Sequence, residues 1–556
     1  MEIDWAGFYA AEQRRRVPLP TYPFERQRYW IEGQPAPPAP ALEPKLAMRD
    51  WFSMPSWKRS HPLALFPQLD LSEHHSVWLV FADAEGLGEQ LAQRLEQQDQ
   101  TVITVNAGEA FAQHDALTYT VHPLEKADYQ ALFQALRAAQ LQPDRIVHLW
   151  NVTSTAAEGE GLPAFYSLLF LAQSLGEEVL TEPVRLAVVA NQVHVVTGEE
   201  QLVAEKAVLL GPCRVMPQEY PQLTCRSIDV VLPPSESGSR SGLIDQLFME
   251  LITDSPDAVV AYRGQRRWVQ TFEPVALGQG RSLLRPQGAY LITNGLSETG
   301  LTLAHYLAQT VQAKLVLTDP APFPDRAAWP DWLASPCADD ETCHKIEQLQ
   351  AIEAFGAEVW VLGATELADI RAALAQVRQQ VGQVHGVIHI PATRGGGLMQ
   401  LKTAEQAQQV LAPRVIDTPM LEAALHDTPL DFLALFGSNV SVTGGLGLVD
   451  ECAASAFLDA YAHSRENPLT FPIIAIDWSG WHWDDHFEQL AAGAPQMQAD
   501  IKLLRETYGI TPEEAGQAFE LALSSAQPQI VVSTRDLQTF IDEQNTLTTS
   551  NVVRQQ

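Results

Sequence analysis

Short apolar runs rich in β-branched residues alternate with amphipathic stretches along most of this chain. In the first cycle the strand-like runs are residues 77–81, 102–105, 146–150 and 185–189, and the helical stretches are 87–97, 129–139 and 164–175. Strands that alternate with helices in this way are typical of parallel sheets whose two faces are covered by helices. The pattern therefore predicts an α/β fold from Trp51 onward.

A second cycle follows the turn-forming loop 233–242 and the strand-like segment 258–272. It begins with a strand at 289–293, a turn that contains glycine, a helix at about 301–309 and a strand at 314–317, and its later strands are 358–362, 384–390, 432–436 and 473–477. Two complete cycles predict two tandem Rossmann-like, doubly wound parallel sheets.

The amino-terminal segment has a different composition. Residues 19–30, LPTYPFERQRYW, are rich in aromatic side chains and arginine, and residues 34–44, QPAPPAPALEP, are rich in proline and alanine. The second stretch predicts an extended tether and a domain boundary. The aromatic side chains before it, namely Tyr22, Phe24, Tyr29 and Trp30, are expected to dock either on another domain or on this chain's own core. The tail after Gln538 is predicted to begin another linker, so we expect this sequence to be a segment of a larger protein.

The charge balance and the hydropathy exclude several classes of partner. The chain has 68 acidic and 36 basic residues, and its formal net charge of −32 opposes attraction to nucleic acid and to anionic membranes. No apolar run reaches the length of about eighteen residues that a membrane span requires, and the first residues lack a signal-peptide pattern. We therefore expect a cytoplasmic protein with no nucleic-acid or membrane partner.

The five cysteines form no CxxC pair and no even disulfide framework, which predicts reduced thiols. Cys337, Cys343 and His344 lie close together in sequence, but no second cluster completes a tetrahedral site. We expect no metal centre.

One turn in the second cycle has the position of a dinucleotide-binding turn. It reads Thr293, Asn294, Gly295, Leu296, Ser297, Glu298, Thr299 and Gly300. In a GxGxxG turn the second glycine lets the backbone approach the pyrophosphate, which rests on the positive end of the following helix. Ser297 occupies the place of that glycine, and Glu298 adds a negative charge that repels phosphate. Asp319 ends the next strand, where an acidic residue can bind a ribose hydroxyl, but we expect this turn not to hold a dinucleotide.

Several segments at consistent spacing resemble the ketoreductase region of modular type I polyketide synthases. They are WFSMPSWKRS (51–60), LLGPCRVMPQEYP (209–221), GAYLITNGLSETGL (288–301), GVIHIPA (386–392), LDFLALFGSNVSVTGGLG (430–447), AFLDAYAHSR (456–465) and IAIDWSGW (474–481). The segment LPTYPFERQRYW is similar to the linker that follows the acyltransferase and packs along the ketosynthase and acyltransferase in such modules. Together these segments extend over nearly the whole chain.

The resemblance implies a domain organisation. It places a post-acyltransferase linker at 1–47, a structural subdomain without cofactor at 48–273, a catalytic-type subdomain at 274–537 and a carboxyl-terminal linker at 538–556. In the family the second subdomain has the short-chain dehydrogenase fold, binds NADPH and reduces a β-ketoacyl chain that phosphopantetheine tethers to an acyl carrier protein. The expected partners are therefore neighbouring ketosynthase–acyltransferase and acyl carrier protein domains.

Four polar residues perform the chemistry in the family. A tyrosine protonates the developing alkoxide, a lysine lowers the pKa of that tyrosine, a serine hydrogen-bonds the carbonyl, and an asparagine follows the tyrosine by one helical turn. The serine falls on Ser438 and is retained. The tyrosine falls on Glu451, the asparagine on Ser455 and the lysine on Arg414 in LAPRV. Three of the four positions have therefore changed.

The changed residues oppose reduction. An ionised Glu451 has no proton to give, and its charge beside a developing oxyanion raises the barrier. Arg414 favours the ionised form, because an opposite charge within hydrogen-bonding range stabilises a carboxylate. We expect the two side chains to pair.

The cofactor positions also depart from the family. The arginine that holds the 2′-phosphate of NADPH falls on Pro320, after Asp319 in LVLTDPA. The family's HAAGxxDDG-type run appears as residues 389–397 without its acidic pair, and no tryptophan lies near Thr443, so no product stereochemistry can be assigned. We expect no bound cofactor at a vestigial site formed by Thr293, Gly295, Ser297, Gly300, Asp319 and Pro320.

Three functions remain open from the sequence. The first is a redox-inactive structural region that passes a β-ketoacyl intermediate on unreduced. The second is an epimerase in which Glu451 removes the α-proton of the β-ketoacyl chain while Ser438 holds the enolate oxygen. The third is an NADPH-dependent reductase in which His389 or His482 replaces the missing acid, although a histidine at such positions is more often structural.

Overall fold

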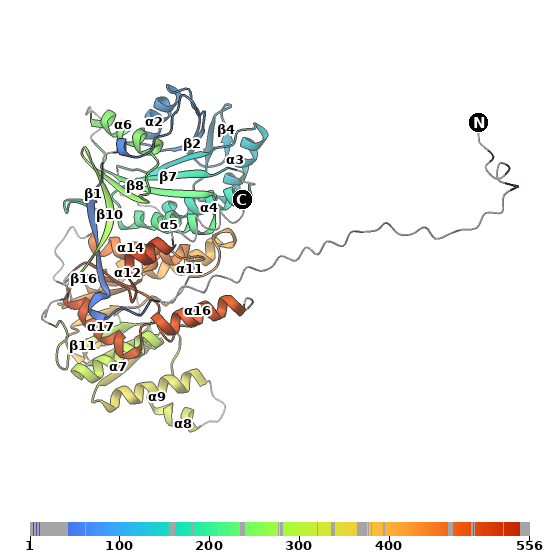
Figure 1. The fold of residues 1–556 in the computed structure, drawn as a ribbon. Coiled ribbons are helices and arrows are strands. Elements are labelled where there is room, and N and C mark those ends of the chain that lie inside the picture. The colour runs from blue at the N-terminus through green and yellow to red at the C-terminus, as the bar shows by residue number, and fades with distance from the viewer. Residues whose placement is uncertain are drawn as a thin grey trace. The chain divides into compact units, whose positions relative to one another are not determined.

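The computed structural model describes residues 43–544 except 62, 155–161, 179–181, 234–238, 276, 278–281, 320, 335–339, 364–374, 376, 380, 393–394, 465–470, 491–492, 494 and 526, and before residue 43 it describes only residues 4, 7, 10 and 11 (Figure 1). Contacts divide the chain into one unit of Met1–Pro44 and a second of Lys45–Gln556. In the first unit the amide of Gly7 donates a hydrogen bond to Asp4 Oδ1 at 2.9 Å. The aromatic residues Tyr22, Phe24, Tyr29 and Trp30 lie outside the described residues.

The first cycle of the second unit forms a sheet that the chain enters at its centre. In spatial order the strands are β4 (Ala112–Gln113), β5 (Thr118–Val121), β3 (Thr101–Ala107), β2 (Val77–Ala82), β6 (Arg145–Asn151), β7 (Val184–Asn191), β8 (Leu223–Val230) and β9 (Val259–Arg263). Its helices are α2 (Leu87–Glu96), α3 (Lys126–Ala138), α4 (Pro163–Glu177), η3 (Ala204–Leu209), α5 (Leu210–Glu219) and α6 (Ser239–Ile252). All pairings are parallel except β4–β5, as a doubly wound sheet requires.

The second cycle repeats this plan with parallel pairings throughout. In spatial order its strands are β13 (Glu358–Gly363), β12 (Lys314–Asp319), β11 (Ala289–Thr293), β14 (Gly386–His389), β15 (Phe432–Ser438), β16 (Ile473–Trp478) and β17 (Gln529–Val532). Its helices are α7 (Glu298–Val311), η4 (Arg326–Ala328), α8 (Trp329–Ala334), α9 (Asp340–Ala354), η5 (Met399–Leu401), α11 (Ala404–Val415), α12 (Asp417–Leu425), α13 (Val440–Thr443), α14 (Val449–His463), α15 (His486–Leu490), α16 (Pro495–Tyr508) and α17 (Pro512–Ser524). The predicted fold of two tandem doubly wound sheets is confirmed.

Two antiparallel strands join the sheets. β1 (Phe52–Arg59), which follows η1 (Met48–Asp50) and precedes η2 (Leu63–Leu65), pairs with β10 (Arg266–Pro274) and, at its start, with β17. β10 in turn pairs with β9 through a hairpin at Gly264, whose φ of 59° favours glycine. The segment 258–272, predicted as one strand, is therefore a hairpin, and the described strands form one continuous hydrogen-bonded array.

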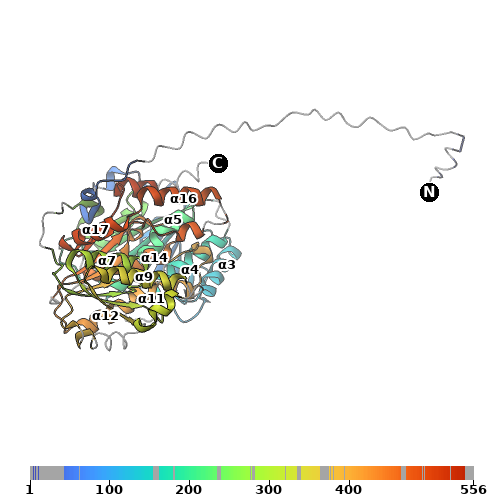
Figure 2. The ribbon, with the colours of Figure 1, turned by 90° about the horizontal axis from the view of Figure 1, so that it is seen from below.

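Helices from both cycles pack against each other between the two sheets. One buried apolar cluster contains residues of α4 and α5 together with residues of α11 and α14 (Figure 2). Gly211 of α5 allows this approach, because a Cβ there would lie 2.5 Å from the carbonyl oxygen of Val449 and 2.6 Å from Ala453 Cβ. The two cycles therefore share a core, and α14 lies at its centre.

No helix within the described residues combines the length and the apolar character that crossing a membrane requires. The predicted carboxyl-terminal linker from 538 onward begins within a helical stretch, since residues 537–544 are helical, and residues 545–556 lie outside the described part.

Candidate functional site

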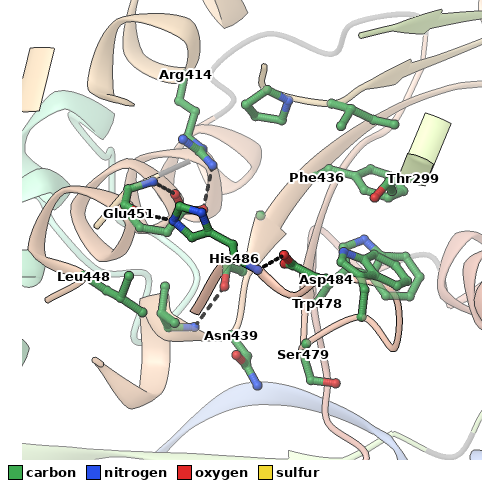
Figure 3. Close-up of a pocket in the computed structure, with 18 residues that line it drawn as sticks. Thr299, Arg414, Phe436, Asn439, Leu448, Glu451, Trp478, Ser479, Asp484 and His486 are labelled. Carbon is green, nitrogen blue, oxygen red and sulfur yellow. Dashed lines mark hydrogen bonds and ion pairs between the residues drawn. The ribbon is translucent and has the colours of Figure 1, made fainter. Parts of the chain in front are cut away.

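A cavity of about 260 Å³ lies at the carboxyl ends of β15 and β16 (Figure 3). The start of α7, the end of α11 and the first turn of α14 also contribute to its walls, through Thr299, Arg414 and Glu451. The carboxyl edge of a doubly wound parallel sheet is the usual ligand-binding edge of such folds. The cavity is therefore the candidate site.

The sequence-predicted positions Ser438, Glu451 and Arg414 all line this cavity. Ser438 is the last residue of β15, and its Oγ accepts a long hydrogen bond of 3.4 Å from the amide of Val440. Ser455 lies one turn after Glu451 on α14 but does not line the cavity. It is fully buried, and its Oγ has no hydrogen-bond partner among the described residues.

Glu451 and Arg414 form the ion pair that the sequence predicts. Arg414 Nη2 donates to Glu451 Oε1 at 2.7 Å, and the two side chains are only 5% and 14% exposed, respectively. Glu451 Oε2 accepts a second bond of 3.0 Å from the amide of Gly395, and Arg414 Nη1 donates to the carbonyl oxygen of Val410 at 3.2 Å. Both carboxylate oxygens are therefore already occupied by donors from the chain.

A second ion pair, which the sequence analysis missed, lies directly behind the first. Lys402 Nζ contacts Asp450 Oδ2 at 2.7 Å, with both side chains 1% exposed, and also donates to the carbonyl oxygen of Gly396. Burial raises the pKa of Asp450, and the ammonium of Lys402 opposes that rise. A Cβ on Gly395 would lie 2.6 Å from Asp450 Oδ1. The loop at 395–396 is therefore held close against the start of α14, and the adjacent acidic residues in VDEC were the available sequence signal.

The two histidines that could replace the missing tyrosine as a proton donor, His389 and His482, lie in different surroundings. His389 is buried, its Nδ1 lies 2.9 Å from Thr293 Oγ1, and burial lowers the pKa of its imidazole to about 4. His482 does not line the cavity, whereas His486 does, with its Nε2 3.2 Å from the carbonyl oxygen of Gly395. His486 follows the tryptophan-rich segment after β16, and no sequence motif marked it as a site residue.

Tryptophan rings line the far wall of the cavity. Trp478 and Trp481 both line it, with ring centroids 4.8 Å apart, and Trp483 stacks on Trp481 at 5.0 Å. Figure 3 shows the Trp478 wall facing the polar cluster around Glu451. One side of the cavity is thus aromatic and the other charged.

Polar groups of the dinucleotide-type turn form hydrogen bonds with one another. Ser297 caps α7, because its Oγ accepts from the amide of Gly300 at 3.1 Å and donates to the carbonyl oxygen of Asn294 at 2.7 Å. A Cβ on Gly295 would lie 2.8 Å from Leu317 Cβ, so this glycine is needed for packing. Asp319 is buried, and its Oδ1 accepts from the amide of Ala321 at 2.7 Å. Pro320 lies outside the described residues, as do Thr393 and Arg394 of the run 389–397.

Within the described residues, no three His, Cys, Asp or Glu side chains gather as metal ligands. Cys343 Sγ lies 3.6 Å from the carbonyl oxygen of Trp332, and Cys337 is outside the described part of the chain.

Two family models match the chain. Residues 288–483 match the model described as KR domain, and residues 76–250 match the model described as Beta-ketoacyl synthase-like, N-terminal. The first range contains every wall of the candidate cavity except Asp484 and His486. Residues 288–483 are therefore similar to KR domains, and residues 76–250 are similar to the amino-terminal part of β-ketoacyl synthase-like proteins.

The curated relatives of this chain include polyketide synthases. Polyketide synthase PksM of Bacillus subtilis is 24% identical over 504 residues, which are 86% of this chain and 11% of the relative. Polyketide synthase GfsA of Streptomyces halstedii is 25% identical over 97% of this chain and 7% of its own length. The chain thus spans a small part of the length of the polyketide synthases that it matches.

Solved structures support the fold. An adenylation, ketoreductase and pseudo Asub multidomain structure of a keto acid-selecting NRPS module superposes with a TM-score of 0.74 at 22% identity, covering 90% of this chain and 41% of that one. An N-terminal ketoreductase from a macrolactin assembly line gives a TM-score of 0.71 at 21% identity, covering 89% of this chain and 94% of that one.

Proposed function

We propose that this chain is a redox-inactive, ketoreductase-like region of a modular polyketide synthase. In this role it maintains the spacing of the module and leaves the β-ketoacyl chain unreduced. The observation that carries the proposal is the closed Arg414–Glu451 pair at the positions where the family's lysine and tyrosine fall. A carboxylate held by a guanidinium has no proton to give to an alkoxide, and arginine cannot act as a tunable ammonium.

The cofactor turn supports the same proposal. A dinucleotide pyrophosphate needs free amides at a helix N-terminus, but the hydroxyl of Ser297 already takes the amide of Gly300. Glu298 follows in the first turn of α7 and repels phosphate. The oxygen of Asp319 that accepts from Ala321 is turned toward its own loop. We infer that NADPH, the cofactor of the family, does not bind here.

The proposed partners are those of a synthase module. The chain would lie between ketosynthase–acyltransferase domains and an acyl carrier protein in the cytoplasm, with linkers at 1–47 and 538–556 and subdomains at 48–273 and 274–537. The phosphopantetheine-tethered β-ketoacyl chain would then pass unreduced to the next step.

Calorimetric titration with NADPH, paired with an assay of NADPH consumption on a β-ketoacyl thioester mimic, tests this function. We expect no binding at millimolar cofactor and no consumption. Glu451→Tyr combined with Arg414→Lys is the matched variant, and it should also fail to consume NADPH because the turn at Ser297 is unchanged. Consumption by the wild-type chain would overturn the proposal.

A second candidate, an epimerase of α-substituted β-ketoacyl chains, is favoured by one observation. Glu451 and Ser438 line the same cavity, so a carboxylate base and a hydroxyl donor face one space. Exchange of the α-hydrogen of a 2-methyl-3-ketoacyl thioester into deuterated water measures this activity. Exchange that Glu451→Gln abolishes would establish it, and equal exchange with and without the protein would exclude it.

A further inference from the structure

A second cavity, of about 340 Å³, lies where the two cycles and the joining strands meet. Trp57 of β1 and Gln270 of β10 form one wall, and His194 and Arg214 of the first cycle form another. Asp459 of α14 belongs to the wall from the second cycle. The cavity therefore lies at the junction of the two cycles with the joining strands β1 and β10, and it shares no lining residue with the candidate site.

Two acidic side chains meet beside this cavity. Asp477 of β16 is fully buried and lies within hydrogen-bonding reach of the carboxyl group of Asp459. Gln529 Nε2 donates to Asp477 Oδ2 at 2.8 Å. Neither Asp459 Oδ1 nor Asp477 Oδ1 receives a hydrogen bond from any N–H or O–H group of the described residues. Two carboxyl groups in such contact attract each other only when one of them carries a proton.

The surrounding charges agree with one shared proton. Arg214 of α5 is the cation that faces both carboxyl groups. His194 and His463, which also line the cavity, stay neutral, because burial lowers the pKa of His194 to about 3 and also lowers the pKa of His463. One guanidinium balances the pair when the two carboxyl groups together carry a single negative charge.

We propose that Asp459 and Asp477 share one proton at neutral pH, and that this proton joins α14 to β16 behind the candidate site, at the junction where Arg214 of the first cycle approaches them. His194 Nε2 and Arg214 Nη1, from two residues that line the cavity, have no hydrogen-bond partner among the described residues. This proton has no role in ketone reduction. Its presence can therefore be tested whether or not the function proposed above is correct.

The junction is linked to the candidate site through the chain itself. Asp477 directly precedes Trp478, which lines the candidate cavity. A Cβ on Gly437, the residue before Ser438, would lie 2.4 Å from Asp477 Oδ1. Asp459 follows Glu451 by about two turns of α14. The pair is therefore close in the chain to three residues that line the site, Trp478, Ser438 and Glu451.

The sign of the pH dependence follows from burial. Burial raises the pKa of Asp459 to about 6. Burial also raises the pKa of Asp477 well above its ordinary value, with the neighbouring carboxyl group of Asp459 as the next cause. The folded chain therefore binds a proton that the unfolded chain releases above the ordinary aspartate pKa of 3.8. The stabilisation by this proton is present in full below that value and is lost as the pH rises through the raised pKa values.

The first test is infrared spectroscopy of the full chain near neutral pH. A protonated carboxyl band should be present at about pH 7 in the wild type and should lose intensity in Asp477→Asn and in Asp459→Asn. An unchanged band in both variants would overturn the proposal. Asp500→Asn, at an exposed position on α16, is the matched control and should leave the band unchanged.

The second test is the pH dependence of thermal unfolding. The amide in Asp477→Asn keeps a hydrogen-bond donor toward Asp459 but cannot release a proton. The unfolding midpoint of this variant should therefore exceed that of the wild type increasingly as the pH rises from about 5 to about 8. Parallel midpoint curves for the variant and the wild type would contradict the shared proton. Asp459→Asn repeats the test if Asp477→Asn fails to fold.

Discussion

Individual side chains at the candidate site are held by charge rather than by apolar packing alone. Glu451 accepts from Arg414 and from the amide of Gly395, and Asp450, the residue before it, accepts from Lys402. Removing one member of a buried ion pair leaves an uncompensated charge, which costs more than the pair itself contributes. Single and double substitutions by neutral residues therefore separate the cost of the uncompensated charge from the contribution of the ion pair.

Arg414→Met should lower the stability of the chain by about 3 kcal/mol, because it leaves the carboxylate of Glu451 in a largely buried position without its cation. Adding Glu451→Gln should recover most of this loss, since the amide still accepts from Gly395. Urea unfolding of the single and double variants measures both. Equal losses in the two variants would show that the lost packing of the Arg414 stem, not the charge, determines the effect.

Lys402→Met should make stability depend on pH in a defined direction. Burial already raises the pKa of Asp450, and without Lys402 nothing in this pair opposes the rise, so the folded chain holds a proton that the unfolded chain releases. The destabilisation should therefore be small at about pH 5 and larger at about pH 8. Thermal midpoints at several pH values measure it, and a pH-independent loss would contradict the role assigned to Asp450.

The sequence predicted the ion pair that lines the cavity, but it did not predict the residues that surround this pair. The pairing of Glu451 with Arg414 followed from charge and family position. Lys402, Asp450 and His486 were missed because each approaches the site from a different loop or helix, and no local pattern records which distant carbonyl or carboxylate a side chain meets.

At the level of elements, the central contact is between α5 and α14. Gly211 lies against the backbone of α14, and the space for a Cβ is already filled. Gly211→Val should therefore push the helices apart and lower stability by about 3 kcal/mol or more, as overpacking does. Thermal unfolding measures this, with Gly363→Ala as the control, since a Cβ at Gly363 meets nothing within 4 Å. An equal effect of the two substitutions would contradict a close-packed helix pair.

Most elements of both cycles were predictable because period and length specify buried strands and amphipathic helices. The β9–β10 hairpin was not, because Gly264 interrupts an otherwise continuous strand-like run from 258 to 272. The role of β1 was also not predictable. Its partners, β10 and β17, are more than two hundred residues away, and local sequence carries no register for such pairs.

At the level of the whole molecule, the two cycles are bound together by a continuous sheet and a common core. β1 pairs with β10 in seven residue pairs, from Ser53↔Pro274 to Arg59↔Trp268, and with β17 at Phe52 and Ser53. The apolar cluster around α14 is completed by α4 and α5 of the first cycle. Neither half therefore covers its own apolar helical face.

This arrangement predicts that the second cycle is unstable by itself. A fragment of residues 274–537 lacks β1, so β17 becomes an open edge, and it lacks α5, so the α14 face is exposed to water. Compared with Lys45–Gln556, the fragment should unfold at a lower temperature and bind a hydrophobic dye in its folded state. The longer piece should unfold in a single calorimetric transition, because cycles that share a core cannot open separately. Two separate transitions, or a fragment as stable as the longer piece, would show that the domain boundary at 274 divides independent units and that the shared core contributes little to stability.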